Sequence, residues 1–247
     1  MEQKSFNIAI DGPAGAGKST IARLAAKQLG FVYVDTGAMY RAIALYFLRK
    51  GICPEDVETI SGQVQGAEIT IRYADGTQQV ILNGEDVSGL IRTEEVGNMA
   101  SATSAIPAVR AHLLELQRNL AASANVIMDG RDIGTCILPD ADVKIFLTAS
   151  TSVRAMRRYR ELQEKGMMCN LEEIEQDIIE RDFRDMNRET APLKQAEDAM
   201  LLDSSDMTLE QVVQAILDAA FSRGFVPGRQ EAYAGTDSGA GVTKEEV

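Results

Sequence analysis

The chain has 247 residues, 45% hydrophobic and 25% charged, a composition that suits one large globular domain and excludes a mostly disordered or fibrous protein. It carries 25 basic and 37 acidic side chains, and the net charge of −12 argues against broad nucleic-acid binding, which relies on a positive field. One histidine and three cysteines without a C-x-x-C pair exclude a histidine-rich metal site and a disulfide framework.

The first third of the chain alternates predicted strands and helices. We predict strands over residues 6–11 and 31–34, and helices over 20–29 and 38–49 that end at Gly30 and Gly51. Between about 63 and 90 the pattern changes to alternating apolar and polar residues, with the turn pairs Asp75-Gly76 and Asn83-Gly84. This pattern predicts a small three-stranded antiparallel insert.

The remaining two thirds return to mixed helices and strands. A helix is predicted from Pro107, strands over 126–128, 143–147 and 200–202, and helices over 152–165 and from Asn170, with Glu173 in the capping position. Thr208 and Gln211 form a capping pair for the last helix. Strands alternating with helices predict an α/β fold with a parallel sheet covered on both faces. We expect a domain over 1–225 and a disordered tail over 226–247.

Residues 12–19 match the pattern G-x-x-x-x-G-K-[ST] between a predicted strand and a predicted helix. In such a loop, backbone N–H groups and the helix N-terminus attract phosphate, Lys18 can reach the β- and γ-phosphates, and the Ser19 hydroxyl can ligate Mg²⁺. The alternative is a glycine-rich turn with an incidental Lys-Ser. The predicted nucleotide-binding residues are Gly12, Pro13, Ala14, Gly15, Ala16, Gly17, Lys18, Ser19 and Thr20.

Arginines are concentrated between residues 110 and 188. Arg181, Arg184 and Arg188 share one helix face, with Asp185 beside them, and their planar guanidinium groups suit phosphate. Residues 154, 157 and 158 form a second arginine cluster. For both clusters the alternative is a solvated helix face whose arginines pair with nearby carboxylates.

Two further segments follow predicted strands, at the sheet edge where α/β proteins bind ligands. Residues 129–132 (Asp-Gly-Arg-Asp) offer ligand contacts, and Asp129 can order the waters of a metal ion; the alternative is a turn held by Asx hydrogen bonds. Residues 35–41 have the same placement, with a plain helix N-terminus capped by Asp35 or Thr36 as the alternative.

The chain offers no clear general base. His112 lies on an apolar helix face, so we expect a core histidine. A hydroxyl acceptor must lose a proton during phosphorylation, whereas a phosphate acceptor is already anionic near neutral pH, with a second pKa of about 6. Lysine, magnesium and many arginines therefore favour transfer from phosphate to phosphate.

These motifs together resemble the bacterial cytidylate kinase family, the (d)CMP kinases. The resemblance runs over about residues 5–223 and is carried by the P-loop, 35–41, 85–88 with 91–92, 129–134, and 181–188 followed by Pro192-Leu193. It implies a P-loop fold with α/β/α layers, an insert at about 63–90 that binds the nucleoside monophosphate (NMP), and a helical lid at about 150–170. It also implies transfer of the ATP γ-phosphate to CMP or dCMP, with Mg²⁺ as cofactor.

The resemblance implies roles for individual residues as well. Lys18, Arg131 and Arg157 would stabilise the transferring group. Thr36, where family members often have serine, would read the cytosine ring together with Ser101, Arg110 and Asp132. The acceptor phosphate would be held by Arg41, Arg131 and Arg188, and the sugar by Arg181 and Asp185.

We expect a cytoplasmic monomer without nucleic-acid or membrane partners, since no signal-peptide pattern and no membrane-spanning apolar stretch is present. Three alternatives stay open. One is a P-loop kinase for UMP, AMP or shikimate, and another is a nucleotide-switch protein, although the Asn-Lys-x-Asp guanine motif is missing. The third, a nucleic-acid-binding ATPase, is disfavoured by the acidic total.

Overall fold

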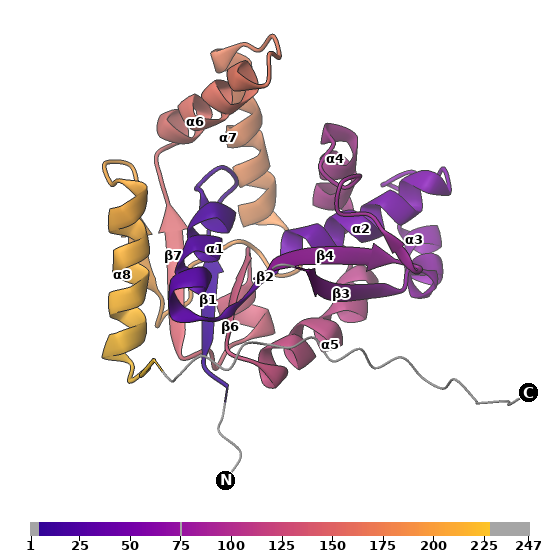
Figure 1. Ribbon diagram of the computed structural model, residues 1–247. Helices are drawn as coiled ribbons and strands as arrows, with labels where there is room; N and C mark the ends of the chain where they lie inside the picture. Colours follow the sequence, from indigo (N-terminus) through magenta and orange to yellow (C-terminus); the bar gives the residue numbers. More distant parts are fainter. Residues whose placement is uncertain (1–4, 75, 228–247) are drawn as a thin grey trace, which may run out of the picture.

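The structure is a computed structural model that describes residues 5–74 and 76–227 (Figure 1). Five parallel strands form its central sheet, in the order β2 (Val32–Asp35), β6 (Val126–Gly130), β1 (Asn7–Asp11), β7 (Val143–Thr148) and β8 (Met200–Asp203). Residues 8–11 of β1 are all buried, because this strand lies at the centre of the sheet. The predicted parallel sheet is confirmed.

Helices cover both faces of this sheet, as predicted. On one face, α1 (Lys18–Leu29) and α8 (Leu209–Ser222) pack through residues such as Ile21 and Ile216 against Ile8 and Ile10 of β1. On the other face, α2 (Thr36–Arg49) and α5 (Pro107–Ser123) join the cluster that contains Ala9. Alternate side chains of one strand thus serve two separate cores, which gives three layers.

The predicted antiparallel insert is also present. It consists of β3 (Ile69–Ala74), β4 (Thr77–Leu82) and β5 (Glu85–Asp86). Asn83 and Gly84 have φ values of 49° and 84°, as the predicted two-residue hairpin turn requires. The other predicted turn includes Asp75, which lies outside the described residues. Val80 and Leu82 bury this small sheet against the core that contains α2.

Two helices and a short 3-10 turn were not predicted. They are α3 (Val57–Gln63), the 3-10 helix η1 (Val64–Gly66) and α4 (Glu94–Thr103). The side chains of Asp56 and Thr93 cap the two α-helices by accepting from the N–H groups of Thr59 and Val96, at 3.0 and 3.3 Å. Their signal in the sequence is a capping residue rather than a long apolar period, because both helices are short.

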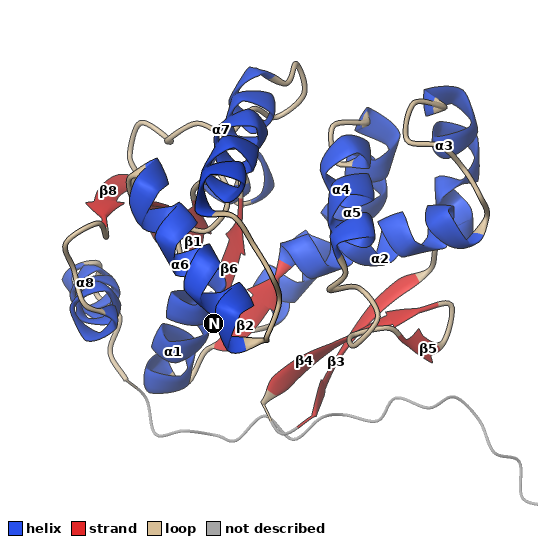
Figure 2. Cartoon of the chain, turned by 90° about the horizontal axis from the view of Figure 1, so that it is seen from above, coloured by secondary structure: helices blue, strands red, loops and turns tan. Residues whose placement is uncertain are grey.

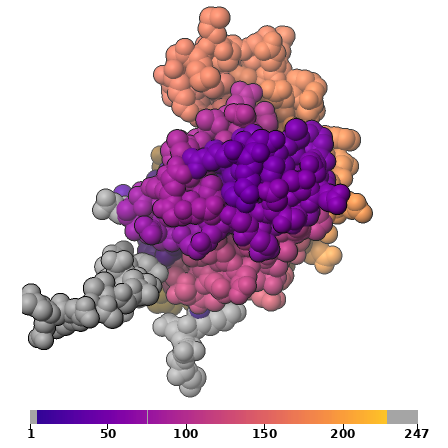
Figure 3. Space-filling model, turned by 90° about the vertical axis from the view of Figure 1, so that its right-hand side faces the viewer, coloured from indigo at the N-terminus to yellow at the C-terminus, as the bar shows by residue number. Residues whose placement is uncertain are grey.

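The helices α6 (Thr151–Glu164) and α7 (Leu171–Asn187) stand above the carboxyl end of the sheet (Figure 1). In the space-filling view this part of the chain, coloured orange, projects at the top of the molecule (Figure 3). Viewed from above, α7 faces α4 across the molecule (Figure 2). Asn170 caps α7 through the Glu172 N–H, at 2.9 Å. The capping box of Thr208 and Gln211 on α8 is confirmed.

Three other features complete the chain. A five-residue π-helical turn, η2 (Ile133–Ile137), follows β6. The predicted tail lies outside the described residues from 228 onward. Among the helices of the described part, none has both the length and the apolar character needed to cross a membrane.

Candidate functional site

The glycine-rich loop after β1 is held in a conformation that its glycines permit. Gly12 has a φ of 151°, and a Cβ atom there would lie 1.9 Å from the Leu147 carbonyl oxygen, so a larger residue does not fit. Gly17, with a φ of 87°, forms the N-cap of α1, so the helix begins at Lys18, two residues before the predicted start. The loop therefore leads directly into the helix N-terminus, the arrangement that binds phosphate.

Lys18 is buried against this loop. Its Nζ donates to the carbonyl oxygens of Gly12 and Pro13, each at 2.7 Å. Burial and the nearby Arg131 guanidinium hold the pKa of Lys18 well below its usual value. The amine is thus a buried cation beside a second cation, a setting that favours a bound anion.

Ser19 and Asp129 form a polar pair beside the loop. Ser19 Oγ donates to Asp129 Oδ2 and Tyr33 Oη donates to Oδ1, both at 2.9 Å. Burial, reinforced by the Asp35 charge, raises the pKa of Asp129 to about 6, although Lys18 opposes the change. Among the described residues no group of three or more His, Cys, Asp or Glu side chains is placed to hold a metal ion.

The buried Asp129 carboxylate predicts a pH-dependent stability. Because its pKa is higher in the folded protein than in the unfolded chain, the folded state binds a proton more tightly there. The stability cost of ionisation is complete above pH 6 and disappears as the pH falls toward 4. In the Asp129→Asn variant this cost is absent. We expect the free energy of unfolding of wild type to approach that of the variant between pH 7 and pH 5 in denaturant titrations; parallel pH curves would contradict the assignment.

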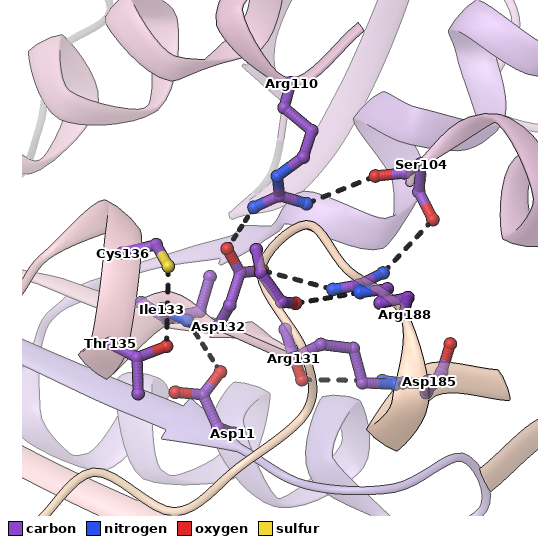
Figure 4. Close-up of polar contacts among 12 residues, drawn as sticks. Asp11, Ser104, Arg110, Arg131, Asp132, Ile133, Thr135, Cys136, Asp185 and Arg188 are labelled. Carbon is purple, nitrogen blue, oxygen red and sulfur yellow. Dashed lines mark hydrogen bonds and ion pairs between the residues drawn. The ribbon is translucent and has the colours of Figure 1, made fainter. Parts of the chain in front are cut away.

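Asp11, the last residue of β1, links the two loops that follow neighbouring strands. Its carboxylate accepts from the N–H groups of Ile133 and Gly134, at 2.7 and 2.8 Å. The side chain is buried, and burial raises its pKa to about 6. The strand that leads into the glycine-rich loop is thereby bonded to the turn that follows Asp132 (Figure 4).

A cleft beside this turn gathers side chains from five parts of the chain. They come from the start of α2, from α4 and α5, from the turn after β6, and from α7 with the residue that follows it. All nine predicted acceptor-binding residues line this cleft: Thr36, Arg41, Ser101, Arg110, Arg131, Asp132, Arg181, Asp185 and Arg188. Residues that are up to 152 positions apart in the sequence thus converge on one surface.

Asp132 lies between two arginines in this cleft (Figure 4). Arg110 forms an ion pair with one carboxylate oxygen, and Arg188 Nη2 lies 3.8 Å from the other. Both arginines also donate to Ser104. Burial raises the pKa of Asp132, and the two guanidinium groups oppose that change. The result is a buried acceptor held in a fixed orientation.

Two arginines near Lys18 differ in how their hydrogen-bonding groups are satisfied. Arg131 Nε donates to Asp185 Oδ2 at 3.0 Å, whereas Arg181 Nε is buried with no hydrogen-bond partner among the described residues. Burial and repulsion from Arg131 lower the pKa of Arg181 to about 10. A buried N–H without a partner is costly unless a ligand oxygen accepts from it, so this end of the cleft suits an oxygen-rich ligand.

The segment 35–41 both caps a helix and contributes side chains to the cleft, the two roles considered for it from the sequence. Asp35 caps α2 by accepting from the Ala38 N–H at 2.9 Å, and Thr36 and Arg41 line the cleft. The Thr36 hydroxyl is buried and donates to the carbonyl oxygen of Asp129 at 2.7 Å. It therefore ties α2 to β6, and its contact with a ligand ring stays a prediction.

Arg157 is not brought into the cleft. Its guanidinium donates to the backbone oxygen and the hydroxyl of Ser204, at 2.8 and 3.2 Å, beyond the end of β8. Its neighbour Arg154 is the arginine that contacts the glycine-rich loop, because it donates to the Ala14 oxygen at 2.9 Å and is paired with Asp182 at 2.6 Å. The catalytic role assigned to Arg157 stays a prediction.

Sequence reasoning missed five residues that line the cleft, and two of them, Tyr40 and Ser104, have polar side chains. Tyr40 lines it, with the Arg110 guanidinium carbon 5.8 Å from the ring centroid, and Ser104 holds both arginines of the Asp132 cluster. Helical spacing could have indicated both, since Tyr40 follows Thr36 by four residues and Ser104 follows Ser101 by three. His112, outside the cleft, donates from Nε2 to the Ala67 oxygen at 2.7 Å.

Two comparisons with known proteins, one with family models and one with curated relatives, name the same family. A family model described as Cytidylate kinase matches residues 8–222. The chain is 51% identical over 215 residues to a cytidylate kinase of Caldicellulosiruptor saccharolyticus, covering 87% of this chain and 95% of that protein. It is 47% identical over 222 residues to a cytidylate kinase of Lactobacillus johnsonii, covering 88% and 96%. Among solved structures, a shikimate kinase from Acinetobacter baumannii is similar with a TM-score of 0.45 and 17% identity, covering 90% of this chain and 96% of that one.

Proposed function

The chain belongs to the cytidylate kinase family, and from that premise we propose that its cleft binds CMP or dCMP beside ATP and that the γ-phosphoryl group passes directly between them. The protein is a nucleoside monophosphate kinase that phosphorylates CMP. Because the chain belongs to this family, we reject the alternatives of a nucleotide-switch protein and a nucleic-acid-binding ATPase. The observation that supports the finer proposal is the convergence of the nine predicted acceptor-binding residues in one cleft next to Lys18.

The Asp132 cluster fits recognition of cytosine. Cytosine presents an exocyclic amino group where uracil presents a carbonyl oxygen, and a carboxylate accepts only from the former. Arg110 and Arg188 hold Asp132 in place, and their charges oppose the rise in its pKa that burial causes. A site built around such a buried hydrogen bond rejects an analogue that lacks the donor.

The cations of the cleft fit the two phosphates. We assign Arg41, Arg131 and Arg188 to the acceptor phosphate, and Arg181 with Asp185 to the sugar. We place Arg131 between the donor and acceptor ends of the site. It donates a hydrogen bond to Asp185, and its charge adds to burial in lowering the pKa of Lys18. Lys18 and Arg131 therefore neutralise the charge that spreads over the transferring group.

No side chain needs to remove a proton in this reaction. The acceptor oxygen belongs to a phosphate that is already anionic, so placement and charge neutralisation provide the catalysis. The burial of Lys18 also limits access of water, which would otherwise compete for the phosphoryl group.

Mg²⁺ is the cofactor that this site fits. Magnesium prefers oxygen ligands and keeps several waters when bound to nucleotides. Ser19 Oγ is a suitable direct ligand, and Asp129, 2.9 Å from that hydroxyl, is placed to order the waters. When bound, the ion neutralises phosphate charge.

We also propose that residues 63–90 form the NMP-binding insert and residues 150–170 the lid. The insert contacts α2, whose first turns line the cleft, and α6 contacts the glycine-rich loop through Arg154. A monomeric state, a cytoplasmic location and the absence of nucleic-acid and membrane partners stay predictions.

The assignment is tested by ADP release with a panel of monophosphates in the presence of ATP and Mg²⁺. We expect rapid release with CMP and dCMP, slower release with UMP and only background release with AMP. Equal rates with all acceptors would contradict base recognition by the Asp132 cluster. ADP release that is independent of any acceptor would contradict the kinase assignment.

A further inference from the structure

The small antiparallel sheet holds the outer edge of the main sheet through side chains. In the described part of the chain β2 has only β6 as a neighbouring strand. On its other edge, Tyr73 Oη donates to the Tyr33 carbonyl oxygen at 3.1 Å. The Gln78 side chain accepts from the Asp35 N–H at 2.8 Å and donates to the Asp35 carbonyl oxygen at 3.2 Å. One amide of β4 thus makes both hydrogen bonds that a paired strand residue would make.

Asp35 is the point at which β2 turns into α2. It is buried, it caps α2 through the Ala38 N–H, and its second carboxylate oxygen receives Arg92 at 2.8 Å. The next residues on α2, from Thr36 to Arg41, contribute side chains to the cleft. Contacts that fix the backbone of Asp35 therefore also fix the orientation of the α2 side chains that line the cleft.

We propose that Gln78 is a positioning residue for the acceptor nucleotide. It acts through Asp35 and not by touching the substrate: by satisfying both backbone groups of Asp35 it holds the first turn of α2, and with it Thr36 and Arg41, in the binding geometry. The inference rests on the proposed function of the cleft. Misplacement of binding groups by a fraction of an ångström is enough to weaken substrate binding and transfer.

Gln78 makes no hydrogen bond to the glycine-rich loop within the described residues. The loop follows β1 and leads into α1, whereas Gln78 contacts β2, an edge strand of the main sheet whose nearest link to the loop runs through Tyr33 and Asp129. The positioning role therefore predicts a selective effect on CMP. If Gln78 only stabilised the fold, its loss would lower stability and leave the ratio of KM for CMP to KM for ATP unchanged.

The test compares Gln78→Met, which keeps the length of the side chain and removes its hydrogen bonds, with Gln79→Met. Gln79 points to the other face of β4 and makes no side-chain hydrogen bond within the described residues. For Gln78→Met we expect kcat/KM for CMP to fall about tenfold, with KM for ATP within twofold of wild type. Faster amide hydrogen exchange over residues 35–41 should accompany it. Gln79→Met should match wild type in all three measurements.

Two results would overturn the proposal: an unchanged kcat/KM for CMP, or an equal loss toward CMP and ATP. The exchange measurement applies even if the variant is less stable, because unchanged protection at residues 35–41 in the folded protein contradicts the role of Gln78. Failure of the proposed function is recognised separately, since wild type and Gln79→Met would then also fail to phosphorylate CMP.

Discussion

Replacing Lys18 with alanine should lower the rate of CMP phosphorylation by on the order of 10³-fold or more while the fold persists. The amine is the buried cation of the glycine-rich loop, and it lies beside Arg131 where the charge of the transferring group has to be neutralised. Its removal leaves Arg131 to neutralise the developing negative charge without Lys18. Since burial already disfavours the charged amine, the unfolding temperature should stay within a few degrees of wild type. ADP release and thermal unfolding measure the two effects.

Lys27 provides the matched control for this variant. It lies in the last turn of the same helix and is exposed, so Lys27→Ala removes a charge from α1 without touching the loop. Its turnover should equal that of wild type. Normal turnover by Lys18→Ala would remove the assignment of this loop as the ATP site.

Replacing Asp132 with alanine should reduce kcat/KM for CMP far more than for UMP. Loss of a hydrogen bond that reads a base edge costs about 1–3 kcal/mol, which corresponds to a roughly 5- to 150-fold loss with CMP. UMP offers no donor to this carboxylate, so its smaller loss reports only the general disturbance of the cleft. The ratio of the two specificity constants is the quantity to measure, because it is insensitive to the amount of folded enzyme.

A second variant at this position separates recognition from stability. The alanine change leaves Arg110 and Arg188 without their buried carboxylate, which is destabilising. Asp132→Asn keeps the shape and adds an amide donor that can face the uracil carbonyl. We expect it to narrow the preference for CMP over UMP further. Equal proportional losses with both acceptors in both variants would show that Asp132 does not read the base.

The fold could be predicted largely because its signals are local. The glycine-rich loop, the hairpin at Asn83-Gly84 and the capping box of α8 are each specified by a few consecutive residues. The helices α3 and α4 escaped prediction because they are short and owe much of their stability to tertiary contacts, such as the burial of Ile60 and Met99 in the core.

For the candidate site, too, some features could be predicted from the sequence and others could not. Its members could be named from motifs and from the family resemblance, but their pairing depends on distances that no sequence pattern carries. Arg131 bonds to Asp185, 54 positions away, and the Thr36 hydroxyl bonds to the backbone of Asp129, 93 positions away. Arg157 shows the limit of reasoning from an arginine cluster. It lies one helical turn after Arg154 and on the same side of α6, yet Arg154 bonds to the loop and Arg157 bonds to Ser204.

The adjacency of β1 and β6 has a consequence for which donors and acceptors can react. These strands are hydrogen-bonded neighbours. β1 leads into the glycine-rich loop and β6 leads into the Arg131-Asp132 turn, and the Asp11 carboxylate links the two ends by accepting two hydrogen bonds. The separation between the glycine-rich loop and the Arg131-Asp132 turn is therefore set at its base by the pairing of two strands, about 4.8 Å apart, instead of by pliable loop backbone. We expect a donor and an acceptor to react only when together they fit this fixed separation.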